Sequence, residues 1–209
     1  MLKMIVNSFK NPEQSWRSFF IEMAILLAAV LFIRFYVFQF FQVSGPSMCP
    51  TLNVLDEQCR SGKGEFVFVN QVTYNFFRNP ERGEVVVFRP PNATKDFYIK
   101  RVIGLPGDTV YVRNGQVYLE DVKIEEPYLS PRNQGRTQSD LEEFVVPEDH
   151  YVLFGDNRDR SLDSRRCYSA SCSDGQTPFV HKKKIKGKAE FVIWPFWTVR
   201  TLDNPLTEY

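Results

Sequence analysis

The sequence predicts a mostly β fold, in which an antiparallel β-sheet domain follows a single N-terminal transmembrane helix. One apolar stretch of membrane-spanning length lies near the N-terminus, at residues 19–41. Short segments rich in β-branched and aromatic residues follow it, separated by Gly and Pro, a pattern typical of strands and turns. Aromatic residues make up 15% of the chain, including 19 Phe, which favours strands and a lipid-facing segment over a helical bundle.

The apolar stretch reads FFIEMAILLAAVLFIRFYVFQFF, and a helix needs about 20 residues to cross the hydrocarbon core. Glu22 lies near one end, and Arg34 lies where its long side chain can snorkel. These two charges leave a buried core helix as an alternative, but the aromatic residues after Arg34 are typical of an interfacial belt and favour a span. A cleavable signal peptide agrees less well, because the apolar core is too long and no small-x-small site follows it.

The charges before the stretch predict its orientation. Lys3, Lys10 and Arg17 precede it, with only Glu13 opposing them, so the positive-inside rule places the N-terminus in the cytoplasm. We therefore expect a single-pass protein of the plasma membrane, although a thylakoid or mitochondrial inner membrane stays open. Its expected parts are a cytoplasmic segment over 1–18, a transmembrane helix over 19–41 and an extracytoplasmic β-rich domain over 42–209.

Strand-like segments then follow in order. They lie at 65–69, 84–88, 97–103, 109–113, 116–119, 151–154 and 189–194. Asn114-Gly115 lies between two of them and suits a type I′ turn, because both central positions of that turn need φ > 0. The polar stretches at 130–140 and 169–176 are expected to be loops. No helical period of useful length follows the apolar stretch, so we expect one mostly antiparallel domain.

The charge balance does not indicate nucleic acid as a partner, since 26 Lys+Arg face 25 Asp+Glu. His150 and His181 are the only histidines and lack the spacing of zinc ligands, so neither a metal nor a cofactor is predicted. The basic run at 181–184 is interpreted as a solvated loop, with a contact to anionic lipid head groups as the alternative.

Four cysteines are too few for a disulfide scaffold. Cys167 and Cys172 would close a small loop if the domain lies outside the cytoplasm. The sequence indicates no role for Cys49 and Cys59.

Residues 44–51, SGPSMCPT, place a serine in a constrained turn. Gly45 and Pro46 before Ser47, and Pro50 after it, prevent a continuous helix. Such a turn can present Oγ outward and leave backbone N–H groups for an oxyanion. Only six residues lead from Phe41 to Ser47, at most ~20 Å of extended chain, so we expect this serine at or near the membrane surface.

Lys100 lies inside an apolar strand segment. Strand alternation puts Lys100 and Tyr98 on one face and Ile99 and Arg101 on the other. Burial among apolar residues lowers the pKa of a lysine, and a neutral amine can take the proton of a serine hydroxyl. A snorkelling lysine on an edge strand is the alternative. Together with Ser47, Lys100 favours a hydrolase that works at the bilayer surface.

Residues 155–165, GDNRDRSLDSR, alternate short polar and charged side chains directly after an apolar strand. They form either a solvated loop with weak local ion pairs or a set of groups that orients Lys100 and ties strands together. The residues alone do not decide between these interpretations.

The three motifs together resemble those of the bacterial type I signal peptidases (leader peptidases), a family of serine proteases with a Ser–Lys dyad. Residues 45–52 resemble its serine box, 98–108 its lysine box and 155–165 its C-terminal box, and the resemblance reaches 194–196. It implies a membrane-bound endopeptidase that removes N-terminal signal peptides from exported preproteins and cleaves after small residues at −1 and −3. The implied partners are preprotein signal peptides and the lipid bilayer, with no obligate protein partner evident.

The resemblance also implies residue roles. Ser47 would be the nucleophile, its backbone N–H an oxyanion donor, and Lys100 the general base, oriented by a hydrogen bond from Ser161. The other supporting residues would be Asp156, Arg158, Asp163, Arg165 and Arg101. The residues of shallow, apolar substrate pockets would be Phe41, Val43, Gly45, Met48, Leu52, Tyr98 and Ile99.

Three features depart from the family pattern. Gly45 stands where one branch has a serine that supplies a second oxyanion donor, so that donor is unassigned. Arg160 stands where asparagine is common. The segment 167–186 is longer and more basic than expected, and no function is predicted for it.

Two other function classes are weighed. One is a catalytically silent, membrane-tethered domain that binds extended peptides, against which the intact Ser47 and Lys100 argue. The other is a self-cleaving Ser–Lys protease, against which the N-terminal span and the lack of a DNA-binding segment argue. Carboxypeptidases with a Ser-x-x-Lys motif are excluded, because Pro50 occupies the +3 position.

Overall fold

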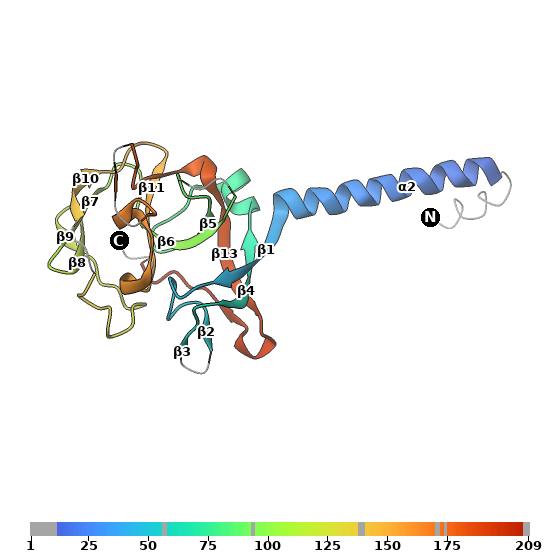
Figure 1. Ribbon diagram of the computed structural model, residues 1–209. Coiled ribbons are helices and arrows are strands. Elements are labelled where there is room, and N and C mark those ends of the chain that lie inside the picture. Colours follow the sequence, from blue (N-terminus) through green and yellow to red (C-terminus); the bar gives the residue numbers. More distant parts are fainter. Residues whose placement is uncertain are drawn as a thin grey trace. The chain divides into compact units, whose positions relative to one another are not determined.

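The computed structural model describes residues 12–55, 58–92, 95–137, 141–169, 172–173 and 175–206. The chain forms two compact units, Met1–Phe38 and Gln39–Tyr209. The second unit is a β domain made almost entirely of antiparallel strands (Figure 1). The predicted fold class, a mostly β domain with one N-terminal apolar helix, is therefore confirmed.

The first unit contains the apolar helix. It consists of α2 (Pro12–Phe32) and a π-helical continuation, η1 (Ile33–Val37). Within the described residues, Trp16–Val37 is the one helical stretch whose length and composition would allow it to cross a membrane. Its side chains from Trp16 to Tyr36 are exposed, which argues against the alternative of a buried core helix.

The helix ends earlier than the sequence predicted. The expected span ran over 19–41, but the residues from 38 onwards form strand β1 (Phe38–Ser44). The prediction was therefore wrong for residues 38–41, which are strand and not helix. From Phe40 to Ser44 the side chains alternate between more exposed and less exposed, the period of two of a pleated strand. Hydrogen bonding to β4 (Lys63–Asn70) stabilises the extended form.

The large sheet has eight strands, in the order β1-β4-β13-β5-β6-β11-β12 with β14 paired to β13. Besides β1 and β4, this sheet contains β5 (Val85–Phe88), β6 (Tyr98–Gly104), β11 (His150–Phe154), β12 (Val180–His181), β13 (Ile185–Trp194) and β14 (Arg200–Thr201). The ladders that join β4, β13, β5, β6 and β11 are all antiparallel.

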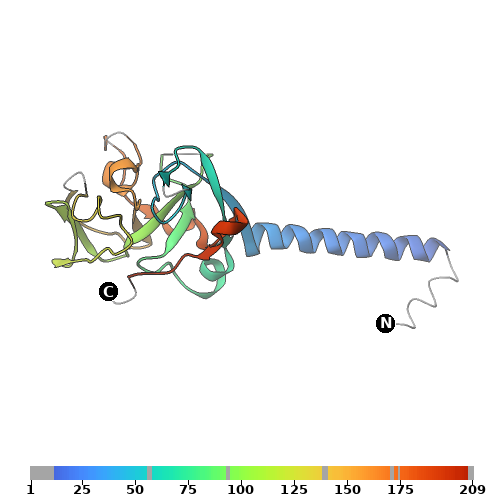
Figure 2. The ribbon, with the colours of Figure 1, turned by 90° about the horizontal axis from the view of Figure 1, so that it is seen from below.

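A second sheet has four strands in the order β10-β7-β8-β9. They are β7 (Thr109–Arg113), β8 (Gln116–Leu119), β9 (Val122–Lys123) and β10 (Leu141–Val145). Asn114 and Gly115 link β7 to β8 with φ of 53° and 74°, so both have the positive φ that the predicted hairpin turn requires. In both views this sheet lies at the far side of the domain from β4 and β13 (Figures 1 and 2).

Each of the seven predicted strand segments overlaps a strand of the structure. The short strands β2 (Val54–Leu55) and β3 (Gln58–Cys59), together with β1, β9, β10, β12 and β14, were not predicted. Short helical turns occupy some connections, namely η2 (Thr73–Phe77), η3 (Arg158–Arg160), η4 (Ser164–Arg166), η5 (Lys182–Lys184) and η6 (Phe196–Thr198). Such brief elements carry no periodic signal that a sequence could display.

Strands β5 and β6 form the centre of the core. Val85 and Val87 pack in one apolar cluster and Val86 and Phe88 in another, so both faces of β5 are buried. Lys100 pairs with Val86 across the β5–β6 ladder. Because these two strands lie in the core, the Lys100 side chain is buried and shielded from water.

The segment 167–186, for which no role was predicted, covers the β5–β6 core. Tyr168, Val180 and Ile185 are buried in the same cluster as Phe88, and the Tyr168 ring lies edge-on to Phe88 with centroids 5.5 Å apart. Cys167 and Cys172 form the disulfide that their spacing allowed. The segment thus supplies one wall of the core.

Candidate active site

Ser47 lies in a loop that leaves β1 and is fixed by its own backbone groups. Gly45 has φ of +82°, a conformation open to glycine, and its N–H donates to the Gly62 carbonyl at 3.1 Å. The Asn53 amide donates to the carbonyls of Gly45 and Gly62 at 3.0 and 3.1 Å. Gly45 and Gly62, at the two ends of the loop, are thus bonded to each other and to the buried Asn53 side chain. These hydrogen bonds fix the main chain of the loop that carries Ser47.

A disulfide joins this loop to the neighbouring hairpin. Cys49, two residues after Ser47, is bonded to Cys59 in β3. Sequence reasoning assigned these two cysteines no role. In the structure they form a covalent link beside the serine. This pairing could not be predicted without the hairpin in which β2 and β3 pair with each other.

Lys100 lies at hydrogen-bond distance from Ser47. Its Nζ is 2.8 Å from the Ser47 Oγ and 2.8 Å from the Ile99 carbonyl oxygen, and the residue is only 3% exposed. Nζ also lies 5.6 Å from the centre of the Tyr98 ring, in agreement with the predicted shared face of Tyr98 and Lys100. Burial lowers the pKa of Lys100 to about 8, although the nearby carboxylates of Asp163 and Asp156 act to raise it.

The expected hydrogen bond between Ser161 and Lys100 is not formed. The Ser161 Oγ is buried and forms no hydrogen bond with Lys100. It lies close enough to Asp163 to help lower the pKa of that carboxyl group, and Lys100 uses the Ser47 hydroxyl and the Ile99 carbonyl instead. Ser161 nevertheless lies close to the loop, since a Cβ added at Gly155 would overlap both the Ser161 Oγ and the Ser47 carbonyl oxygen. The predicted contact between Ser161 and Lys100 is thus corrected, and a supporting role for Ser161 stays a prediction.

Arg101 and Asp156 form a fully buried ion pair beneath the site. The Arg101 Nε and Nη2 lie 3.0 and 2.7 Å from the two Asp156 carboxylate oxygens, and their side chains are 2% and 0% exposed. Arg101 also donates to the Gly83 carbonyl at 2.7 Å, and the Thr51 hydroxyl donates to Asp156. The pair therefore joins β6, the end of the Ser47 loop and the segment after β11.

The remaining supporting residues form two further buried pairs. Asp163 accepts from Arg165 Nη2 at 2.8 Å and from the Gly155 N–H at 2.9 Å. Burial by itself raises the pKa of Asp163, but the Arg165 guanidinium outweighs this and holds that pKa below its usual value. Arg158 is paired with Glu126. Apart from the exposed Arg160 and Leu162, the segment 155–165 is therefore largely buried and joined by ion pairs, which argues against a solvated loop.

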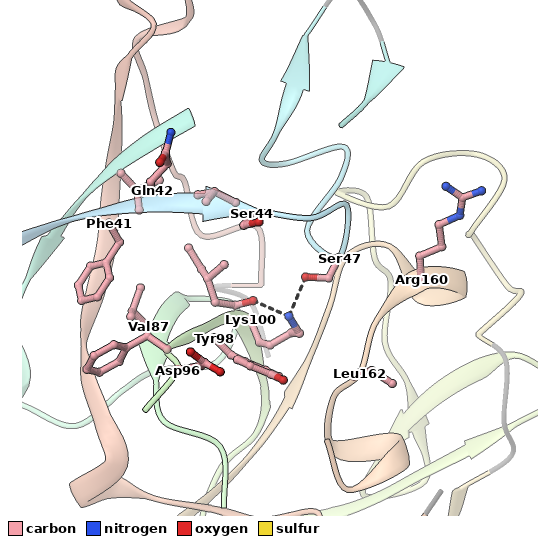
Figure 3. Close-up of a pocket in the computed structure, with 14 residues that line it drawn as sticks. Phe41, Gln42, Ser44, Ser47, Val87, Asp96, Tyr98, Lys100, Arg160 and Leu162 are labelled. Atoms are coloured by element: carbon pink, nitrogen blue, oxygen red, sulfur yellow. Dashed lines mark hydrogen bonds between the residues drawn. The ribbon is translucent and has the colours of Figure 1, made fainter. Parts of the chain in front are cut away.

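A cavity of about 530 Å³ opens beside Ser47 and Lys100 (Figure 3). Figure 3 shows Phe41, Val87 and Tyr98 on one side of the Ser47–Lys100 contact and Arg160 and Leu162 on the other. The lining residues are Phe41, Gln42, Val43, Ser44, Ser47, Val67, Val87, Asp96, Phe97, Tyr98, Ile99, Lys100, Arg160 and Leu162. Four of the seven expected substrate-binding residues are among them, namely Phe41, Val43, Tyr98 and Ile99.

The other three expected substrate-binding residues do not line the cavity. Met48 and Leu52 are 1% and 0% exposed and belong to the apolar core. The Leu52 N–H donates to the Met48 carbonyl at 2.9 Å, and this helical turn directs both side chains inward. Gly45 has no side chain to contribute, and its N–H is already engaged with Gly62.

Sequence reasoning missed several lining residues. Val87 lies opposite Ile99 on the neighbouring strand, so the strand pairing, once known, would have placed it in the cavity wall. Phe97 directly precedes the lysine box, and its ring contacts Phe41 with centroids 5.1 Å apart. Arg160 and Leu162 flank Ser161, and only the folded turn places them beside Ser47.

Residues 16–194 match the family model described as "Signal peptidase, peptidase S26". The chain belongs to this signal peptidase family. It is 37% identical over 185 residues to a signal peptidase I of Bacillus amyloliquefaciens, covering 85% of this chain and 88% of that protein. It is also 37% identical over 186 residues to signal peptidase I S of Bacillus subtilis, covering 85% and 89%.

Among solved structures, the chain is similar to a crystal structure of a signal peptidase I from Enterococcus faecalis. That likeness has 29% sequence identity and a TM-score of 0.44, and it covers 53% of this chain and 97% of the other. As a member of the S26 signal peptidases, the protein is a serine peptidase, and its family's activity is the removal of signal peptides.

The buried Arg101–Asp156 pair yields a prediction about stability. Asp156→Asn leaves a buried guanidinium without a counter-charge, which we expect to cost about 3–5 kcal/mol of the free energy of unfolding. Thermal unfolding of the detergent-solubilised full chain measures the effect. The matched control is Glu125→Gln, because the Lys123–Glu125 pair is 43% and 73% exposed and such pairs contribute about 0–1 kcal/mol. Equal unfolding temperatures for the two variants would contradict the argument.

Proposed function

We propose that this chain is a membrane-anchored signal peptidase that cleaves preproteins with a Ser–Lys dyad, Ser47 acting as nucleophile and Lys100 as general base. One observation carries the proposal. A buried lysine amine, with its pKa lowered to about 8, lies 2.8 Å from a serine hydroxyl at the edge of an open cavity.

The proposed first step transfers the Ser47 proton to the neutral Lys100 amine while Oγ attacks the scissile carbonyl. The tetrahedral intermediate collapses to an acyl-enzyme as the lysine ammonium returns the proton to the leaving amine. Water, deprotonated by the again neutral Lys100, then attacks the ester, and the lysine ammonium returns that proton to the leaving Ser47 Oγ as the signal peptide is released. The proton balance closes over each half-reaction, so no histidine is needed.

The Ser47 backbone N–H is our candidate for one oxyanion donor. The Gly45 N–H is not a candidate for the second, because it donates to the Gly62 carbonyl at 3.1 Å. The supporting roles proposed for Arg101, Asp156 and Asp163 are to hold β6 and the 155–165 segment against the Ser47 loop, as their buried contacts support.

The substrate is proposed to bind as an extended strand along β1. This strand is at the edge of the large sheet, and four of its residues, Phe41 to Ser44, line the cavity. An edge strand offers backbone hydrogen bonds to a peptide, and alternate side chains then enter pockets. The apolar walls formed by Val43, Val87 and Ile99 suit small residues such as Ala at −1 and −3.

The apolar helix is proposed as the membrane anchor, with the N-terminus cytoplasmic and the β domain extracytoplasmic at the plasma membrane. Trp16–Val37 has the length and composition of a span, and Lys3 and Lys10 before it, with Arg17 at its start, favour a cytoplasmic N-terminus. Ten residues lead from Val37 to Ser47, at most ~36 Å of extended chain. A nucleophile within this reach can meet a cleavage site that emerges from the bilayer.

The first functional prediction concerns the nucleophile. Ser47→Ala removes one oxygen and little volume, so we expect cleavage of a preprotein with an Ala-x-Ala site to fall by roughly a thousand-fold or more while the protein stays folded and membrane-bound. Ser173→Ala, in a loop outside the site, is the matched control and should keep the wild-type rate. Wild-type turnover by Ser47→Ala would exclude the serine mechanism.

The second functional prediction concerns pH. Because only the neutral amine can act as a base and its pKa is about 8, the rate constant kcat/KM should rise about ten-fold per pH unit below that value and level off above it. Lys100→Met should be inactive at every pH. A wild-type rate that stays flat from pH 6 to 10, or an active Lys100→Met, would show that another group activates Ser47.

A further inference from the structure

A second cavity, of about 610 Å³, lies beside the Ser47 loop. Its walls come from the residues just after the serine, Cys49 and Pro50, from the turn at Asn157 to Arg160, and from the 130–133 loop. Arg160 lines both this cavity and the one that holds Lys100. It is therefore a residue that the two cavities share, and Figure 3 shows it on the far side of Ser47 from Phe41.

The turn that carries Arg160 is fixed to the nucleophile's own backbone. The Asn157 N–H donates to the Ser47 carbonyl at 3.0 Å, and the Arg160 N–H donates to the Asn157 carbonyl at 3.1 Å. Gly155 lies so close to the Ser47 carbonyl that a Cβ there would overlap it. These contacts hold the Arg160 backbone next to Ser47, while its side chain is exposed.

The two cavities border different stretches of chain on either side of Ser47 in the sequence. The residues before Ser47, from Phe41 to Ser44, line the apolar cavity, and the residues after Ser47 line the second one. This step rests on the proposed function: if −1 and −3 occupy the apolar cavity, the peptide passes Ser47 and continues towards Arg160. The first residues of the mature protein then lie beside the guanidinium.

The charges around the second cavity favour an anionic side chain there. Asp159 is already paired with Arg132 at 3.6 Å. No acidic group among the described residues is within ion-pair distance of Arg160. A guanidinium is a fixed cation with a planar fork of donors that matches a carboxylate. Arg160 thus presents an unused cation at the exit from the catalytic centre.

We propose that Arg160 is a specificity-determining residue that selects preproteins with Asp or Glu at the first or second position after the scissile bond. Its guanidinium binds the incoming carboxylate in the second cavity, on the side of Ser47 opposite to the apolar pockets. The effect is modest because the pair is partly solvated, about two- to five-fold in kcat/KM, as for other exposed ion pairs. It weakens as ionic strength rises.

The test uses the detergent-solubilised full chain and three model preproteins that share one Ala-x-Ala site and differ only in carrying Asp, Asn or Lys at both positions after it. The ratio of kcat/KM values, Asp over Lys, is measured for wild type, Arg160→Gln and Arg160→Glu at low and high salt. We expect the wild type to prefer Asp, Arg160→Gln to lose the preference and Arg160→Glu to prefer Lys. High salt should bring all three ratios towards one.

The matched control is Arg113→Gln, which removes the same charge from strand β7 and should keep the wild-type ratio. If the wild type cuts the three preproteins equally, or if its preference survives in Arg160→Glu, the Arg160 proposal is overturned and the proposed function stands. If the wild type cuts none of them, the proposed function fails, and this inference fails with it. A preference lost equally in Arg113→Gln would show a long-range effect of net charge rather than selection by Arg160.

Discussion

The site depends on the buried ion pair between Arg101 and Asp156. Arg101 follows Lys100 directly in β6, and the two side chains leave the strand on opposite faces, so fixing one fixes the backbone of the other. The Arg101 guanidinium also donates a hydrogen bond to the Gly83 carbonyl, and Asp156 accepts one from the Thr51 hydroxyl. Burying two charges costs several kcal/mol of desolvation for each ion. We therefore interpret the pair as a device that sets the geometry of three segments rather than as a source of stability.

The same ion pairs help to keep the pKa of Lys100 low, at about 8. Two carboxylates, Asp156 and Asp163, act to raise the Lys100 pKa, but each has its own arginine partner at 2.7–2.8 Å. Their negative charges are largely compensated, so the desolvation of Lys100 dominates. A protein that buried the lysine beside unpaired carboxylates would stabilise an ammonium, which cannot accept a proton. The paired charges of the 155–165 segment thus let the pKa of Lys100 stay low, as its proposed role as a base requires.

The proposed substrate path has two sides of different character because two stretches of chain meet at Ser47. Strand β1 brings apolar residues to one side, and the loop after Ser47, together with the turn at 157–160, brings polar and charged residues to the other. Two backbone hydrogen bonds hold Ser47 at this junction: the Gly45 N–H donates to the Gly62 carbonyl, and the Asn157 N–H donates to the Ser47 carbonyl. Strand β1 leads directly into the site, since its residues Phe41 to Ser44 line the cavity.

The apolar helix, the main strands and the hairpin at Asn114-Gly115 could be predicted from local pattern. Ser47 and Lys100 could be chosen as candidates because each lies in a contiguous motif. Tertiary structure alone decided the rest. The end of the helix at Val37 depends on pairing between β1 and β4, the Cys49–Cys59 link depends on a short hairpin, and the inward turn of Met48 and Leu52 depends on core packing. The absent Ser161–Lys100 bond and the position of Arg160 are set by contacts between segments more than 50 residues apart in the chain, and no local pattern encodes such distances.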